Sequence, residues 1–194
     1  VSRHGILGVQ GPSGRGKSTL LKLLMRYWDP SSGTVALSDV PLPDVDAAWR
    51  RRVQTMMGQE SYLFDGTIRE NLMMALPDRD ASHAADAIDR KLRDALVRAS
   101  ALELVDSLPQ GLDTQVGELG GRLSEGERQR IGLARVFLRD ADLVLFDEPT
   151  SRLDAYNESV ILQSINGLAD QGRAIVLVSH RDSTMRIADR IVRM

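Results

Sequence analysis

A glycine-rich segment near the start of the chain has residue types and spacing suited to holding phosphate groups. Residues 11–19 read GPSGRGKST and fit the pattern G-x-x-x-x-G-K-[ST] between an apolar run and a helical pattern. The glycines let backbone N–H groups turn toward phosphate oxygens, and the helix N-terminus adds the positive end of its dipole. Lys17 is expected at the β- and γ-phosphates, Ser18 on Mg²⁺ and Thr19 near the α-phosphate. The predicted nucleotide-binding residues of this loop are Gly11, Pro12, Ser13, Gly14, Arg15, Gly16, Lys17, Ser18 and Thr19.

A second segment carries two adjacent carboxylates at the end of an apolar run. Residues 143–154 read LVLFDEPTSRLD. Asp147, at the end of a buried strand, can hold Mg²⁺ beside bound phosphates. Because neighbouring strand positions face opposite ways, Glu148 is expected to point elsewhere and to accept a proton from an attacking water. The alternative is an ordinary turn that caps the next helix through Thr150 or Ser151, and the phosphate loop disfavours it.

Two single residues are weaker candidates for the same site. His180 follows a third apolar run, so it could lie at the carboxyl edge of a sheet, where we predict a contact with the γ-phosphate. Gln59 lies at the entrance to a helical region, where its side-chain carbonyl could reach Mg²⁺ or water, but alone it carries almost no signal. The predicted catalytic residues are Glu148, His180 and Gln59. The predicted Mg²⁺ ligands are Ser18, Gln59 and Asp147.

The segment LSEGERQR, residues 123–130, begins a helix and raises a question. Ser124 with Glu127 three residues later has the pattern of a capping box. The box does not explain Gly126 in the first turn, where glycine costs about 1 kcal/mol relative to alanine. A helix start with free N–H groups also binds anions. The local pattern therefore allows either a simple helix start or an anion-binding site.

Three short apolar runs are expected to be the buried strands that position these residues. They cover residues 6–9, 143–146 and 175–178, with helical patterns in the intervals, which is typical of an α/β domain with a mostly parallel sheet. Helices are predicted over residues 17–27 and 151–168. Between residues 69 and 108 the pattern is helical throughout. The residues spaced there for one helix face are Ala84, Ile88, Leu92, Ala95, Leu96 and Ala99.

These elements predict two parts of the chain. We predict an α/β core over residues 1–59 and 124–194, with an inserted helical subdomain over residues 60–123.

The composition limits the possible functions. The 25 basic and 27 acidic residues give a net charge of -2, so the chain has no excess of positive charge with which to bind nucleic acid. The chain has no cysteine, which excludes disulfides and thiolate metal sites. No apolar run approaches the roughly 20 residues of a membrane span. We expect a soluble piece of a longer protein.

In order along the chain, the phosphate loop, Gln59, LSEGERQR, DEPTSRLD and SHR resemble the motifs of the nucleotide-binding domain of ATP-binding cassette (ABC) transporters. The resemblance covers nearly all of the chain. It implies the RecA-like fold of P-loop NTPases, with ATP and Mg²⁺ as ligands and ATP hydrolysis coupled to membrane transport. Four further segments resemble the exporter branch of the family: LFDGTIREN at 63–71, TQVGELG at 114–120, HRDST at 180–184 and ADRI at 188–191.

The resemblance also implies partners. In this family the LSGGQ signature of one domain covers the ATP held by the phosphate loop of a second domain, in a head-to-tail dimer. LSEGE matches this segment with Ser124 and Gly126 retained, and Asp154 matches an aspartate that reaches across the dimer. The implied partners are a second nucleotide-binding domain, identical or homologous, and the transmembrane domains of an exporter, without nucleic acid. The chain is expected at the cytoplasmic face of the membrane.

Three features depart from the family pattern. Glu127 replaces the usual glutamine, a mild change that suits the capping box. Glu125 replaces a glycine near the expected γ-phosphate, and two like charges about 4 Å apart repel by some 4 kcal/mol at an effective dielectric of 20. Glu125 must therefore point away or pair with a cation, for which Arg122 and Arg128 are candidates. The family's adenine-stacking aromatic lies well upstream of Gly11, so we expect this chain to bind ATP weakly.

Two alternative functions remain open at this point. Soluble ABC-type ATPases of DNA maintenance carry a long coiled coil between the phosphate loop and the signature, whereas Lys17 and Ser124 are only 107 positions apart. Those of translation carry two cassettes in one chain. The other alternative is a hydrolysis-poor regulatory half of a heterodimeric exporter, which Glu125 favours and which Glu148 and His180 disfavour.

Overall fold

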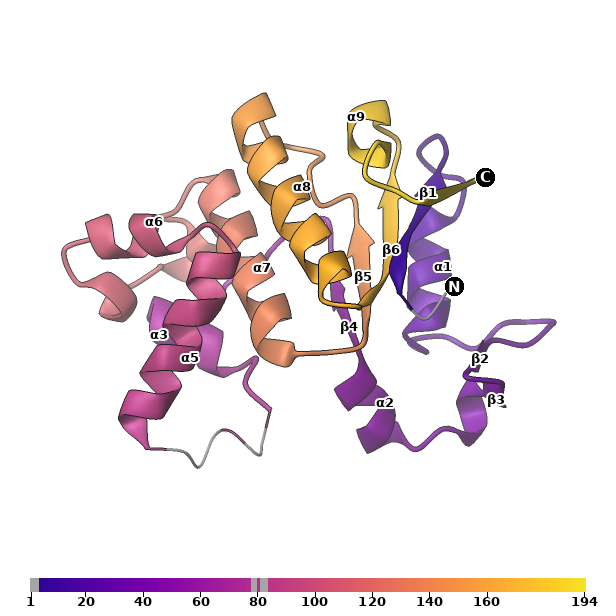
Figure 1. Cartoon of the computed structure of the whole chain (residues 1–194), viewed down its shortest axis with the longest axis horizontal. Helices are drawn as coiled ribbons and strands as arrows, with labels where there is room; N and C mark the ends of the chain where they lie inside the picture. The colour runs from indigo at the N-terminus through magenta and orange to yellow at the C-terminus, as the bar shows by residue number, and fades with distance from the viewer. Residues whose placement is uncertain (1–3, 78–79, 81–83) are drawn as a thin grey trace.

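A parallel five-stranded sheet lies between the helices of the molecule (Figure 1). The computed structural model describes residues 4–77, 80 and 84–194. Every neighbouring pair of strands in this sheet is parallel, and the spatial order is β4-β5-β6-β1-β7. The strands are β1 (Gly5–Gln10), β4 (Gln54–Met57), β5 (Leu143–Asp147), β6 (Ala174–Ser179) and β7 (Arg190–Arg193). A separate antiparallel pair consists of β2 (Ala36–Leu37) and β3 (Val40–Pro41).

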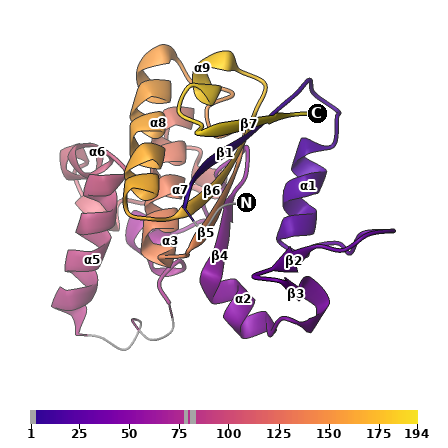
Figure 2. The ribbon, with the colours of Figure 1, turned by 45° about the vertical axis from the view of Figure 1, so that its right-hand side comes forward.

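The three predicted strands are confirmed to within one residue at each end, as β1, β5 and β6. They are apolar because the sheet is covered on both faces, as expected for parallel strands. Figure 2 shows α1 on one side of the sheet and α7 and α8 on the other. In β6 every residue is buried, with Ile175 and Leu177 in the core shared with α7 and α8, and Val176 and Val178 packed with Leu21 of α1.

The helices differ from their predicted bounds mainly at their ends. They are α1 (Lys17–Leu24), α2 (Ala47–Val53), α3 (Ile68–Met73), α5 (Ala85–Arg98), α6 (Leu102–Ser107), α7 (Glu125–Arg139), α8 (Ala155–Asp170) and α9 (Asp182–Met185). Single 3₁₀ turns cover Leu42–Asp44, Gly111–Asp113 and Glu118–Gly120. The predicted helix 17–27 ends early, because the backbone of Arg26 is left-handed with φ 53°.

The prediction of a helix from residue 151 was wrong. The helix α8 begins at Ala155, and Asp154 caps it by accepting a hydrogen bond from the Asn157 N–H at 2.9 Å. Neither Thr150 nor Ser151 is the cap. The Thr150 hydroxyl is instead hydrogen-bonded to the Thr184 hydroxyl at 2.8 Å. The turn after β5 therefore makes tertiary contacts before the helix begins.

The prediction that residues 69–108 are helical throughout was also wrong. The chain leaves the helical conformation after α3 and again between α5 and α6, where Ser100 has a left-handed backbone with φ 52°. Residues 78–79 and 81–83 of that stretch lie outside the described residues. The predicted face of α5 is buried, except for Ala84, which is exposed at the N-cap.

The helix α7 connects the α3–α5–α6 region to the sheet. It packs against α3 and α5 on one side and against β4 and α8 on the other. One apolar core extends across it, from Leu92 of α5 through Ile131 of α7 to Ile175 of β6. The division into residues 1–59 plus 124–194 and residues 60–123 stays a prediction. Within the described ranges, no helix combines the length and apolar composition that crossing a membrane requires.

Candidate functional site

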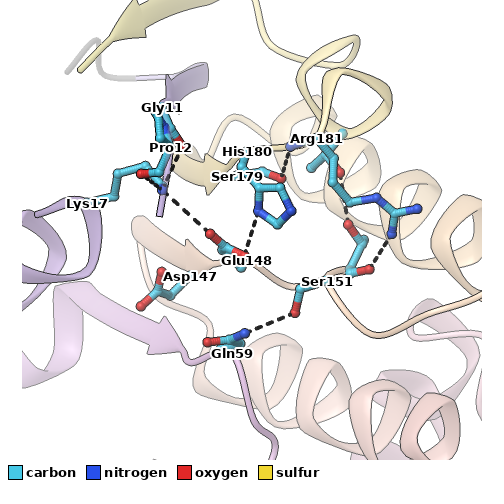
Figure 3. A network of polar contacts seen from close by, with 12 residues as sticks. Gly11, Pro12, Lys17, Gln59, Asp147, Glu148, Ser151, Ser179, His180 and Arg181 are labelled. Carbon is cyan, nitrogen blue, oxygen red and sulfur yellow. Dashed lines mark hydrogen bonds and ion pairs between the residues drawn. The ribbon is translucent and has the colours of Figure 1, made fainter. Parts of the chain in front are cut away.

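The carboxyl ends of β1, β5 and β6 bring the predicted residues to one edge of the sheet (Figure 3). Because β6 pairs in parallel with both neighbours, Gly11, Glu148 and His180 follow three adjacent strand ends. This is the edge at which open parallel sheets bind ligands. Chain segments more than a hundred residues apart thus form one surface.

The loop 11–19 follows β1 and leads directly into α1. Gly14 and Gly16 have left-handed backbones with φ 81° and 87°, and a Cβ atom on either would meet nothing within 4 Å. Glycine is therefore favoured at both positions because of the left-handed backbone, and not because a side chain would clash with neighbouring atoms. No side chain caps α1 at Gly16, and its first turn holds no acidic residue, as an anion-binding helix start requires. Gly11 differs, since a Cβ there would lie 2.7 Å from the main-chain oxygen of Met194.

The side chain of Lys17 is buried within this loop. Its Nζ donates hydrogen bonds to the carbonyl oxygens of Gly11 at 2.8 Å and Pro12 at 2.9 Å. The same atom lies 3.6 Å from Oε1 of Glu148. The ammonium therefore has an oxygen partner on each side, as a buried cation needs. A bound phosphate could take over these contacts.

Asp147 and Ser18 form a pair of oxygen ligands suited to a small divalent cation. Ser18 Oγ donates to Oδ1 of Asp147 at 3.1 Å. Burial raises the pKa of Asp147, and the Ser18 hydrogen bond partly opposes this shift. A buried carboxylate whose charged form is disfavoured would be stabilised by a cation, and carboxylate and hydroxyl oxygens are ligands that Mg²⁺ accepts. The two residues therefore fit the predicted role.

Gln59 lies on the same side of the site as Asp147 (Figure 3). Its Nε2 donates weakly to Ser151 Oγ at 3.4 Å, and its carbonyl oxygen lies on the side of Asp147 (Figure 3). Within the described residues, no group of three or more histidine, cysteine, aspartate or glutamate side chains is arranged to hold a metal ion. Mg²⁺ at this position would therefore need phosphate or water oxygens to complete its shell.

Glu148 connects Lys17 to His180. Its Oε2 lies 2.9 Å from Nδ1 of His180, on the opposite side of the carboxylate from the Lys17 contact. The different directions of Asp147 and Glu148 were expected from strand alternation, but the cause is different. The strand ends at Asp147, and Glu148 adopts a left-handed backbone with φ 49° while its N–H still donates to Val178 O at 2.9 Å. This strained turn sets the carboxylate between its two partners.

The site combines a glycine-rich loop, a buried carboxylate that is hydrogen-bonded to Ser18, and a second carboxylate between Lys17 and His180. The model of the family described as ABC transporter matches residues 1–151. The chain belongs to the ABC transporter family.

Individual members of the ABC transporter family match over almost the whole chain. A probable ABC transporter ATP-binding/permease protein of Haemophilus influenzae is 44% identical over 99% of this chain and 33% of its own length. The ATP-dependent lipid A-core flippase of Ralstonia nicotianae is 40% identical over 99% of this chain and 31% of its own length. The structure of a bacterial Atm1-family ABC exporter with ATP bound superposes with a TM-score of 0.88, at 32% identity, over 98% of this chain and 32% of that chain. The chain spans about a third of each of these relatives.

The ABC signature segment starts α7, and its capping box is present as predicted. Ser124 Oγ accepts from the Glu127 N–H at 3.4 Å, and Glu127 Oε2 accepts from the Ser124 N–H at 2.7 Å. Glu125 pairs with Arg128 at 2.6 Å between Oε2 and Nη2. The predicted need for a cation is therefore met, and of the two candidates it is Arg128, not Arg122, that meets it.

Gly126 has a packing reason that sequence reasoning missed. It is buried, and a Cβ atom on it would lie 2.8 Å from both Cγ and Oδ1 of Asn157. Asn157 also donates from its backbone and from Nδ2 to Asp154, at 2.9 Å each, and these bonds lower the pKa of Asp154. One asparagine therefore lies between two predicted ligand residues. The spacing Asp154-x-x-Asn157 was the signal that could have identified it.

The signature segment and the phosphate loop do not meet within the chain. Residues 11–19 and 123–128 are fully described, and no hydrogen bond or ion pair joins them. Figure 2 shows the sheet between α7 on one face and α1 on the other. The two halves of the predicted ATP site are therefore held apart by the fold.

Proposed function

We propose that this chain is the ATP-binding and ATP-hydrolysing domain of an ABC exporter, acting at the cytoplasmic face of a membrane. The observation that carries the proposal is the line Lys17–Glu148–His180, with Nζ of Lys17 3.6 Å and Nδ1 of His180 2.9 Å from the two carboxylate oxygens. In this proposal Lys17 binds phosphate, Glu148 is the general base and His180 positions it, and their mutual contacts support these roles. The names of the relatives, which include an ATP-binding/permease protein and an exporter with ATP bound, support the same function.

In this proposal, residues 11–19 hold the triphosphate. Lys17 leaves the carbonyls of Gly11 and Pro12 for the β- and γ-phosphate oxygens, exchanging neutral acceptors for charged ones. Ser18, Gln59 and Asp147 would hold Mg²⁺, which would supply positive charge beside the phosphates. The Asp147 carboxylate, whose charged form burial disfavours, would be stabilised by such a cation.

Glu148 is the proposed general base. Water attacks the γ-phosphorus, the bond from this phosphorus to the β,γ-bridging oxygen breaks with ADP as the leaving group, and a proton of the water passes to Glu148. In the structure, Oε1 of Glu148 faces Lys17 and Oε2 faces His180. When Lys17 moves to the phosphates, Oε1 becomes free to accept the proton while His180 keeps Oε2 in place. Nucleotide binding would thereby activate the base.

The proposed partner is a second nucleotide-binding domain. Since the segment led by Ser124 lies away from its own phosphate loop, it is available to cover the ATP of a neighbour, together with Gly126 and Asp154. The pairing of Glu125 with Arg128 weakens the repulsion that this carboxylate would exert on a γ-phosphate. ATP favours the closed dimer only through its higher affinity for that state. Residues 114–120 and the region around Gln59 would transmit closure to transmembrane domains.

Replacing Glu148 by glutamine tests this function. Glu148→Gln keeps the size of the side chain but removes the proton acceptor, so turnover of Mg-ATP by this chain should fall at least about 100-fold. Binding of mant-ATP should stay within about twofold, and a dimer should accumulate with ATP on size-exclusion chromatography. Glu103→Gln, on the exposed surface of α6, is the matched control and should hydrolyse ATP like the wild type. Undiminished hydrolysis by Glu148→Gln would remove Glu148 from its role.

A further inference from the structure

The carboxylate of Glu158, on α8, is buried behind the site and has no part in the proposed chemistry. Its exposed fraction is 6%. Its hydrogen-bond and ion-pair partners all follow His180 in the chain. Arg181 Nη2 lies 2.9 Å from Oε2, and the hydroxyls of Ser183 and Thr184 donate to Oε1 at 2.7 and 3.1 Å. A buried charge is tolerated only when it is paired in this way. Glu158 therefore fixes the segment 181–184 to α8.

Arg181 also reaches the turn that follows Glu148. Its Nη1 donates to the carbonyl oxygen of Thr150 at 2.7 Å (Figure 3 shows Arg181 beside this turn). A second bond, between the fully buried hydroxyls of Thr150 and Thr184 at 2.8 Å, joins the same two segments. Two hydrogen bonds therefore join Thr150, in the turn after Glu148, to Arg181 and Thr184, in the segment after His180.

The His180 ring itself has little direct support. It is 46% exposed, and its one hydrogen bond among the described residues is the 2.9 Å contact from Nδ1 to Glu148. Its position against Glu148 must therefore come from the backbone that carries it, and the adjacent residue, Arg181, is the one held on both sides.

We propose that Glu158 and Arg181 are positioning residues, which hold the His180 imidazole against the Glu148 carboxylate. Arg181 bridges the two catalytic segments, and Glu158 holds the Arg181 guanidinium in the orientation that makes this bridge possible. The inference rests on the proposed function for its catalytic consequence, but the contact that it concerns can be measured independently of hydrolysis. Neither residue touches the phosphate loop, so the network should affect turnover and leave ATP binding alone.

Kinetics of two variants test the catalytic part. Glu158→Gln keeps acceptor atoms for the two hydroxyls but removes the charge that faces Arg181, and Arg181→Lys keeps the charge but loses the forked geometry. Because displacing a catalytic group by about 1 Å costs on the order of 100-fold, we expect kcat to fall by about 10- to 100-fold. The Kd for mant-ATP should stay within about twofold. Arg173→Gln is the matched control, since it breaks arginine pairs with Asp140 and Asp142 at the opposite end of the strands.

The same variants are then made in a His180→Ala background. If Glu158 and Arg181 act through the imidazole, they should lower kcat no further there. A loss of kcat in that background equal to the loss in the wild type would overturn the proposal, because the network would then act by general stability. A weakening of mant-ATP binding in parallel with kcat would overturn it as well.

A measurement independent of hydrolysis reads the contact itself. A neutral His180 ring that bonds a carboxylate through Nδ1 must carry its proton there. Long-range ¹⁵N–¹H spectra, assigned with His180→Ala, should show the Nδ1–H tautomer in the wild type and a mixture in Glu158→Gln and Arg181→Lys. An unchanged tautomer in both variants would refute the positioning role. If neither the wild type nor Glu148→Gln hydrolysed ATP, the proposed function would be wrong. The spectrum would still test whether Glu158 and Arg181 position the His180 ring.

Discussion

The two halves of the proposed ATP site are built in opposite ways. At the phosphate-loop edge, formed by Lys17, Asp147, Glu148 and His180, the contacts join distant positions: Ser18 to Asp147 across 129 residues and Glu148 to His180 across 32. At the signature tip, residues 123–128, the contacts of Ser124 with Glu127 and of Glu125 with Arg128 each join positions three apart. The parallel sheet brings the residues of the edge together, whereas a single helix turn brings those of the tip together.

This difference indicates how each half should respond to change. The edge already holds a cation and carboxylates in contact, so its side chains must exchange partners when a nucleotide arrives. The tip satisfies the N–H groups of Ser124 and Glu127 with its own side chains, and Gly126 packs against Asn157, which is bonded to Asp154. Substitutions at the edge should therefore alter nucleotide binding by a single chain, and substitutions at the tip should not.

Removing the lysine amine is the largest expected effect. Lys17→Ala removes charge-assisted hydrogen bonds to the phosphates, each worth about 1.5–3 kcal/mol, so the affinity for mant-ATP should fall by about 10- to 100-fold. Ser124→Ala, at the tip, is the matched control, and the affinity of the monomer should stay within twofold. Isothermal titration of both variants at monomeric concentration makes the comparison. Equal losses in the two would mean that the tip contributes to the nucleotide site of its own chain.

The tip is more sensitive to volume than to charge, because Gly126 lies against Asn157. Gly126→Ala places a methyl group 2.8 Å from the Asn157 amide, and such overpacking typically costs about 1–3 kcal/mol of folding free energy. In a chain of this size, each 1 kcal/mol lowers the Tm by about 2–4 °C.

Gly167→Ala, in α8, is the control for this substitution. A methyl group there meets nothing within 4 Å and should stabilise the helix by up to about 1 kcal/mol. Differential scanning calorimetry should show opposite shifts for the two variants. A rise in Tm for both would show that Asn157 yields easily and that the close approach to Gly126 imposes no constraint.

The same contrast explains which features the sequence could reveal. The three buried strands and the capping box depend on neighbouring residues, and they were predicted to within a residue. The pairing of Glu125 followed from charge and spacing, although the choice between Arg122 and Arg128 required the helix itself. The pattern of residues 11–19 could be found because glycine, lysine and serine each meet a separate chemical requirement of phosphate binding, and the binding itself stays a prediction.

Features that depend on tertiary structure were missed or given the wrong cause. The left-handed turn at Glu148 occurs at a non-glycine residue, so no local pattern predicts it. The break at Ser100 interrupts an apolar pattern that continues through it, because the chain must turn between α5 and α6. Asn157 fills space beside Gly126, and Glu158 pairs with a strand-end segment 23 positions later. Such pairings become visible only when the sheet brings the segments together.

The smallest expected effect concerns the charge at the signature tip. Glu125→Gln removes an i,i+3 pair with Arg128, which should change the free energy of unfolding by only about 0.2–0.5 kcal/mol, and less at high salt. Because Arg128 already offsets the carboxylate, ATP-driven dimerisation in the Glu148→Gln background should strengthen by no more than about twofold on analytical ultracentrifugation. Glu103→Gln provides the baseline for losing a surface carboxylate. A tenfold gain in dimer affinity with Glu125→Gln would instead mean that the carboxylate faces the partner's γ-phosphate despite its pairing with Arg128.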